Sequence, residues 1–349
     1  MTEATMEISE RQHLFSTRTV LVFSALGVIA LLMLLLNIGI GSLNYSPAQI
    51  IDIVLHPAND TASTIIWNIR IPRALGAVMG GAYLAIAGLL LQVYFRNPIV
   101  GPYILGISSG ATVMVSIVML TTLTAGLAAT FNPYMCTLAA ILGSYTVMAI
   151  ILAISTKIRS GITLLIVGLM MGYLCSAVTA ILSALAEKER IKGFILWELG
   201  SFSGFKWSEI YVLAVLGGAL LVLIYALSKP LNAFLLGEQY ATSMGVNIKK
   251  FRVLILMSSG ALAAIVTSVA GPVAFIGMAV PHIARLVFGT SDNRILIPGA
   301  CLAGAAIASL CDLIARMVMS PVELPLSSIT AFFGAPIVLS LLLKRKVEL

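Results

Sequence analysis

Long apolar runs alternate with short polar segments along almost the whole chain. The first 17 residues are mostly polar, and ten apolar runs follow, at 19–40, 72–94, 104–124, 133–156, 162–184, 209–228, 253–270, 273–289, 295–313 and 326–343. An α-helix of about 20 residues crosses the roughly 30 Å hydrocarbon core of a bilayer. The pattern therefore predicts an all-α membrane protein with ten transmembrane helices.

These runs define a single membrane domain at 19–344, with polar tails at 1–18 and 345–349 and one long polar connection at 229–252. The first run is longer than the apolar core of a secretory signal, and no small-residue cleavage site follows it. We therefore expect residues 19–40 to be an uncleaved first span. No soluble domain and no low-complexity segment interrupts the pattern.

Composition supports a membrane protein and gives its orientation. Hydrophobic residues make up 60% of the chain and charged residues 10%, against about 25% charged in soluble domains. Of the 21 Lys and Arg residues, 14 fall on the side of the predicted membrane that holds both chain ends. Positive charge accumulates in cytoplasmic segments, so both termini are expected in the cytoplasm. The same rule explains the net charge of +7 without a nucleic-acid partner.

Residues typical of metal or nucleotide sites are sparse. The four cysteines lie in apolar runs without C-x-x-C spacing, so we expect small core residues and no metal site. His282 is interpreted as a structural histidine. The chain has no P-loop motif and therefore does not hydrolyse ATP through one. Asp312 and Glu323 lie near the outer ends of their spans, which disfavours a self-contained proton-coupled carrier.

The stretch FRNPIVGPYILGISSGA, residues 95–111, interrupts two apolar runs on the cytoplasmic side. Asn97-Pro98 and Gly101-Pro102 break helical continuity twice, because proline lacks a backbone donor and restricts the residue before it. Irregular backbone near a membrane needs protein or a watery cavity to receive its polar groups. The segment either lines a pathway or forms an ordinary turn between helices.

Two further polar features are candidate binding sites for a partner. LLGEQYATSMGVNIKKFR, residues 235–252, is an amphipathic cytoplasmic connection that is either solvated or docks a soluble protein. Arg70, Arg73 and Arg316 lie at external span ends, against the positive-inside trend. They are expected to dock an acidic external protein or to attract an anionic substrate.

Four motifs in order resemble the permease subunits of the type II ABC importers for iron chelates, haem and cobalamin. They are IRIPRALGAVMGGAYLAIAGLLLQVYFRNPIVGPYILGISSGA, LLGEQYATSMGVN, GPVAFIGMAVPHIARLVFG, and DLIAR with ELPLSSITAFFGAPIVLSLLLK, within residues 65–344. The resemblance implies a homodimer of ten-span subunits in the inner membrane of a prokaryote. It also implies two cytoplasmic ATPase subunits, which use ATP and Mg, and an external substrate-binding protein. This chain itself is expected to bind no cofactor and to have no catalytic site.

The resemblance also assigns roles to residues. Coupling to the ATPases is expected at Leu235, Leu236, Gly237, Glu238, Gln239, Ala241, Met244, Gly245 and Val246. Docking of the binding protein is expected at Arg70, Arg73 and Arg316, and a cytoplasmic gate at Asn97, Ile99, Gly161 and Ile162. The resulting hypothesis is ATP-driven alternating access for a metal chelate. Ferric siderophore ranks first, with haem, cobalamin and oxyanions as other substrates.

Two other functions are weighed against this hypothesis. The first is a proton-coupled secondary transporter with the same number of spans, which would transport without ATP under a proton gradient. The second is a channel or scaffold, which would stimulate no ATPase. Neither of these two functions accounts for the four motifs that resemble an importer permease.

Overall fold

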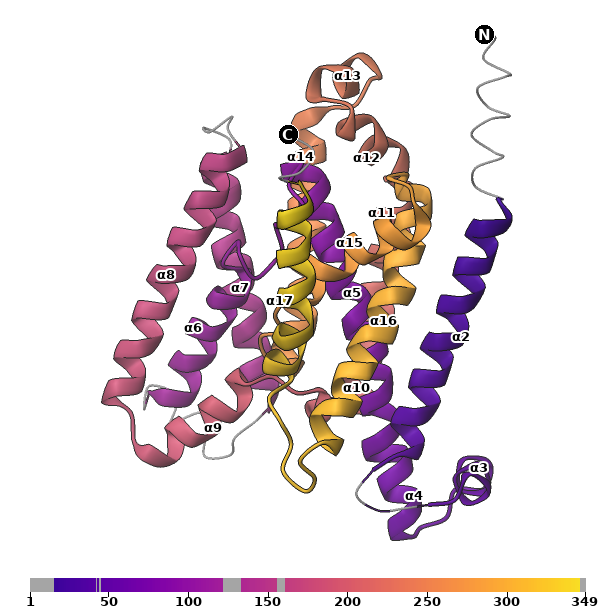
Figure 1. The fold of residues 1–349 in the computed structure, drawn as a ribbon. Helices are drawn as coiled ribbons and strands as arrows, with labels where there is room; N and C mark the ends of the chain where they lie inside the picture. The colour runs from indigo at the N-terminus through magenta and orange to yellow at the C-terminus, as the bar shows by residue number, and fades with distance from the viewer. Residues whose placement is uncertain (1–15, 42, 44, 122–132, 156–160, 346–349) are drawn as a thin grey trace.

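The structure of the chain is a computed structural model that describes residues 16–41, 43, 45–121, 133–155 and 161–345, without the side chains of 133–134, 155, 161–162 and 341–345. Every regular element in these residues is helical, which confirms the all-α class. The α-helices, labelled as in Figure 1, are α2 (Thr17–Gly39), α3 (Pro47–Leu55), α4 (Thr61–Ile65), α5 (Ile71–Phe95), α6 (Ile107–Leu120), α7 (Pro133–Ser155), α8 (Gly161–Leu185), α9 (Lys188–Glu198), α10 (Trp207–Val212), α11 (Gly218–Ala226), α12 (Ser228–Leu235), α13 (Glu238–Ser243), α14 (Ile248–Ala270), α15 (Ile276–Phe288), α16 (Asn293–Met317) and α17 (Leu326–Arg345). Two π-helical segments, η1 (Ile66–Arg70) and η4 (Leu213–Gly217), and the short 3-10 helix η3 (Phe202–Gly204) complete the set.

Seven helical stretches are long and apolar enough to cross a membrane: Thr17–Gly39, Thr61–Phe95, Met135–Ile154, Thr163–Leu185, Trp207–Ala226, Ile248–Ala270 and Asn293–Met317. Three shorter apolar helices are Ile107–Leu120, Ile276–Phe288 and Leu326–Ser340. Every apolar run predicted from the sequence thus contains a helix. The 14 residues of α6 and the 13 of α15 reach only about 20 Å each, so the count of ten full spans stays a prediction.

Polar side chains fix where several helices begin. The Ser16 hydroxyl accepts from the Thr19 amide at the start of α2, and Asn247 accepts from the Lys250 amide at the start of α14. Asp60 accepts from the Ser63 amide at the start of α4. Each cap satisfies one of the backbone donors that the first turn of a helix leaves without a partner.

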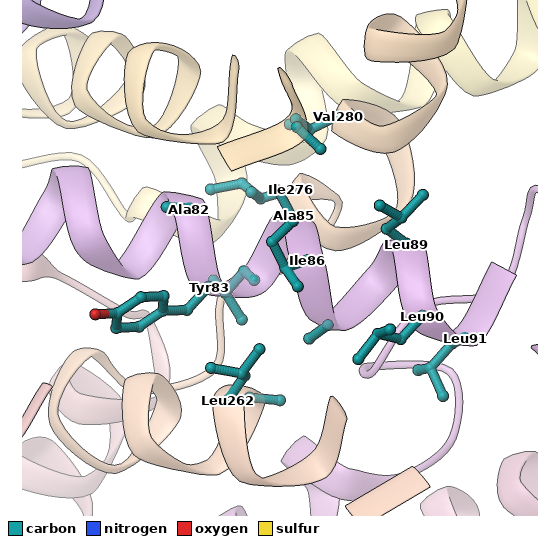
Figure 2. Packing of buried hydrophobic residues seen from close by; sticks show 14 of the residues in the cluster. Ala82, Tyr83, Ala85, Ile86, Leu89, Leu90, Leu91, Leu262, Ile276 and Val280 are labelled. Atoms are coloured by element: carbon teal, nitrogen blue, oxygen red, sulfur yellow. The ribbon is translucent and has the colours of Figure 1, made fainter. Parts of the chain in front are cut away.

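The central helix is α5, which packs against α14, α15 and α16 (Figure 1). Figure 2 shows five buried side chains of α5: Tyr83, Ile86, Leu89, Leu90 and Leu91. Leu262 of α14 and Ile276 and Val280 of α15 belong to the same buried cluster. Small residues permit these crossings, because transmembrane helices associate by close backbone approach. A Cβ added to Gly88 would lie 1.5 Å from the carbonyl oxygen of Gly277, so the backbones of α5 and α15 touch there.

A second group, α6 to α9, stands beside the first (Figure 1). Here α6 packs against α7, α8 and α9, and α7 contacts α14, which joins the two groups. Both short helices follow irregular backbone: α6 comes after residues 96–106, and α15 after residues 271–275. The first of these segments approaches the start of α15, since a Cβ on Gly277 would lie 3.0 Å from the ring of Pro102. Part of this broken backbone is therefore packed against another helix.

Candidate functional site

The three arginines predicted to dock an external protein lie where α5 begins and α16 ends, at the end of the bundle opposite α13 (Figure 1). Arg73 stands in the first turn of α5 and is 7% exposed. Its guanidinium donates to Asp312 from Nη2 at 2.9 Å and from Nε at 3.1 Å, and to Glu323 from Nη1 at 2.6 Å. Asp312 lies on α16 with its side chain 1% exposed. A planar guanidinium suits such a bidentate contact, so this is a buried, well-formed ion pair.

Arg316 lies one turn beyond Asp312 on α16 and extends the same network. Its Nη2 donates to the backbone oxygen of Asn37 at 2.6 Å and to Asn37 Oδ1 at 3.0 Å, and its Nε lies 3.9 Å from Asp312. Asn37 is buried at the end of α2 and donates from Nδ2 to the carbonyl of Ser309 at 3.0 Å. These contacts bind α2, α5 and α16 together at one end of the bundle.

Arg70 closes the end of α2. Its Nη1 donates to the carbonyls of Ile38 at 3.1 Å and Gly39 at 2.9 Å, and its Nη2 donates to the carbonyl of Leu43. Its guanidinium also lies 5.2 Å from the centre of the Tyr45 ring. The last carbonyls of a helix lack partners within it, and a basic side chain that reaches them stabilises the helix end.

That these three arginines also have partners within the chain was not predicted from the sequence. The guanidinium of each has partners within the chain, because the ends of three helices meet there. Asn37, Asp312 and Glu323 are the members of the site that sequence reasoning missed. The docking role itself stays a prediction, since docking requires these side chains to exchange partners.

The predicted coupling segment forms two short helices, α12 and α13, at the other end of the bundle (Figure 1). Gly237 separates them with φ 133°, and Gly245 follows the second with φ 85°; glycine adopts both conformations without strain. Leu236 is 69% exposed and Met244 is 64% exposed, while Ala241 is fully buried. The other predicted coupling residues divide in the same way: Glu238 and Gln239 are exposed, and Leu235 and Val246 are half-buried.

Aromatic side chains attach this segment to the rest of the bundle. Phe234 of α12 is 1% exposed and stacks on Tyr94 near the end of α5, with ring centres 5.9 Å apart. It also packs on Phe251 of α14 at 5.2 Å, and the Arg96 guanidinium lies 5.1 Å from its ring centre. Phe234 therefore contacts the end of α5, the start of α14 and the residue that opens the segment 96–106.

The predicted gate is described in part. Arg96 ends α5 in a left-handed conformation with φ 47°, and the Asn97 side chain accepts from the Ile99 amide at 3.1 Å. Both Asn97 and Ile99 are half-buried. Gly161 and Ile162 open α8, but their side chains lie outside the described residues. The pairing of the two halves of the gate stays a prediction.

A cavity of about 300 Å³ lies between the gate and coupling segments, lined by Asn97, Leu235 and residues of α5, α15 and α16. Gln92 and Arg285 line it and bind each other, with the Arg285 Nη1 donating to Gln92 Oε1 at 2.6 Å. Gln92 also donates to the carbonyl of Met278 at 2.9 Å. His282 lines this cavity too, and no cluster of three metal-ligating side chains occurs in the described part of the chain.

Comparisons with known proteins find similarity over most of the chain. The family model for the FecCD transport family matches residues 29–344. The chain is 32% identical to a hemin transport system permease of Yersinia pestis over 91% of this chain and 95% of that protein. It is 34% identical to a vitamin B12 import system permease of Salmonella arizonae over 80% of this chain and 83% of that protein.

A solved structure has the same fold. It is described as a metal-chelate type ABC transporter in an inward-facing conformation, and it superposes with a TM-score of 0.80 at 28% identity. The match covers 93% of this chain and 99% of that chain. The similarity therefore extends over nearly the full length of both chains.

Proposed function

The chain belongs to the FecCD transport family, and from that premise we propose that it is the permease subunit of an ATP-driven importer for a metal chelate. The observation that carries the proposal is the surface formed by α12 and α13. It exposes Leu236 and Met244 at the end of the bundle, yet it rests on the buried Phe234. Exposed apolar side chains on a rigid base are typical of a protein docking surface.

The proposed mechanism is alternating access. Two cytoplasmic ATPase subunits bind the α12–α13 surface of two permease copies and move it as ATP binds and is hydrolysed. Phe234 transmits that movement to the end of α5 and to Arg96, its neighbours in the structure. The segment 96–106 then opens or closes a path between the two copies. Both chain ends lie in the cytoplasm of a prokaryotic cell in this proposal, and an external binding protein delivers the chelate.

Ferric siderophores are the first substrates to test, followed by haem and cobalamin, which the relatives' names suggest. A proton-coupled carrier has less support, because such a carrier needs a carboxylate that is free to exchange protons within the membrane. The buried Asp312 is instead held by Arg73 and Arg316.

The test is reconstitution of the permease in liposomes with its candidate ATPase and binding protein. Chelate-loaded binding protein should stimulate ATP hydrolysis and give ATP-dependent uptake. The variant Leu236→Ala/Met244→Ala should lose the ATPase on co-purification, since both apolar anchors are removed. Leu55→Ala is the matched control, because Leu55 is 67% exposed on α3 at the opposite end. An ATPase that never co-purifies, or uptake that needs only a proton gradient, would refute the importer.

A further inference from the structure

A second cavity, of about 390 Å³, lies between the two groups of helices toward the α9 end. It is lined by residues of α6, α8 and α9, by Tyr103, by Pro272 and Ala274, and by Ser327 at the start of α17. Its volume falls within the range of about 300–1,000 Å³ that is usual for small-molecule sites. Among the described side chains, none assigned to coupling, docking or the gate lines it, although Tyr103 belongs to the segment 96–106.

Hydroxyl groups cover two of its walls. Ser108, Ser109 and Thr112 come from α6, and Ser176, Thr179 and Ser183 come from α8. Spacings of three and four residues place side chains on one face of a helix, and α6 packs directly against α8. The two hydroxyl-bearing faces thus meet at the cavity. Such a lining offers both donors and acceptors to an oxygen-rich ligand.

Thr179 is the clearest sign of a ligand. It is 8% exposed, and its hydroxyl has no hydrogen-bond partner among the described residues. Buried hydroxyls in folded proteins are nearly always paired, because leaving one unpaired is costly. Thr112 satisfies this rule by donating to the carbonyl of Ser108 at 3.1 Å. A polar ligand in the cavity would supply the partner that Thr179 lacks.

The charge that the cavity lining carries is negative. Among the described residues that line the cavity, Glu198 is the one Asp or Glu, and none is Lys, Arg or His. Glu198 is also the last residue of α9, where the helix dipole disfavours an acidic side chain. Part of the side chain is exposed, yet burial of the rest raises the pKa of its carboxyl group. A cationic or hydrogen-bond-donating ligand would offset both costs.

We propose that this cavity is a transit site that favours neutral or cationic, oxygen-rich metal chelates over anionic ones, with Glu198 as the residue that selects charge. The inference rests on the proposed transport function and adds the chemical class of the substrate. It favours ferric hydroxamates, whose three hydroxamate charges balance the ferric ion. It disfavours tricatecholate complexes and haem, which carry net negative charge or ionised carboxylates.

The charge selectivity is tested on the purified permease, without transport. Ser183→Cys places a thiol in the cavity, and its reaction rates with a cationic and an anionic methanethiosulfonate are compared. Each rate is divided by that of a free thiol in solution, after subtraction of the signal from the four native cysteines. We expect the cationic reagent to be favoured by about tenfold, which corresponds to about 1.4 kcal/mol. Adding Glu198→Gln should remove most of this preference.

Glu189→Gln is the matched control, since Glu189 is an exposed acid on the same helix outside the cavity. It should leave the preference unchanged. A normalised ratio near one, or a ratio that Glu198→Gln does not lower, would overturn charge selection at this cavity. The reconstituted uptake assay decides the importer function separately, because the labelling rates do not depend on an ATPase or a binding protein.

Discussion

Replacing Asp312 with Asn should strongly destabilise the end of the bundle where α2, α5 and α16 meet. Asp312 accepts from Arg73 at 2.9 Å and lies 3.9 Å from Arg316, while its own side chain is 1% exposed. The amide keeps the size of the carboxyl group and removes its charge. Two buried guanidinium groups would then lose the negative charge between them, and water cannot replace it.

The magnitude follows from this burial. Two unit charges about 4 Å apart interact by about 4 kcal/mol at an effective dielectric constant of about 20. Removing one partner of a buried pair typically costs about 3–5 kcal/mol, because the other charge stays desolvated. Glu323 also accepts from Arg73, but its side chain is 44% exposed. Solvent screens that contact, so Glu323→Gln should cost only about 0–1 kcal/mol.

The assay is thermal unfolding of the purified permease in detergent, with Asp312→Asn, Glu323→Gln, Arg73→Gln and the double variant Arg73→Gln/Asp312→Asn. Asp312→Asn should lower the melting temperature far more than Glu323→Gln. The double variant should lose less than the two single variants summed, with a coupling energy of about 1–3 kcal/mol. Equal shifts for Asp312→Asn and Glu323→Gln would refute the reasoning. If Arg73 only docks a partner, Arg73→Gln would weaken docking and leave the melting temperature unchanged.

Three further predictions concern packing and helix ends. In thermal unfolding, Phe234→Ala should destabilise the permease by about 3–5 kcal/mol, as is usual for a buried core Phe. Leu236→Ala should change stability by less than about 0.5 kcal/mol, because Leu236 is exposed. Gly88→Ala should impair folding, because its Cβ would meet the backbone of α15; the measurement is the yield of monodisperse protein. Gly218→Ala is the control, since a Cβ there has open space, and it should be neutral or stabilising. Hydrogen bonding to the Ser63 side chain and to the Ser63 amide lowers the pKa of Asp60. The contribution of Asp60 to α4 should therefore be complete above the unfolded pKa of about 3.9 and be lost as pH falls through the lower folded value. Hydrogen exchange of the α4 amides should follow that dependence in the natural chain and not in Asp60→Asn.

The sequence was sufficient to predict a helix in each of the ten apolar runs and a break after the second run. Apolar runs of membrane length dictate helices, because backbone polar groups find no other partners in lipid. Asn97-Pro98 was also informative, since proline fixes the break after α5 whatever the tertiary contacts. The helix α9 was not anticipated, because its charged residues place it outside any apolar run. Its contact with α6 is a tertiary contact that local sequence does not encode.

The contacts of the three arginines could not be predicted from the local sequence. The partners of Arg73 lie 239 and 250 residues away along the chain, so no residue near Arg73 in the sequence indicates them. A charge at a span end is equally compatible with an external partner and with a carboxylate on another helix. One local signal was present: Asp312 and Arg316 are four residues apart, a spacing at which helical side chains interact. That spacing indicated that at least one arginine has an internal partner.

One helix connects the two ends at which partners are proposed to bind. The 25 residues of α5 extend about 37 Å, from Arg73 in the ion-pair network to Tyr94 beneath Phe234. The helix is buried against α14, α15 and α16, so it cannot bend without disturbing the core. In the proposed mechanism, we therefore expect a displacement of α12 and α13 to reach the arginine end as a movement of this whole group. The chain passes from this group to α6 through residues 96–106, where the helical backbone is already interrupted, so we expect that segment to absorb the movement relative to α6–α9.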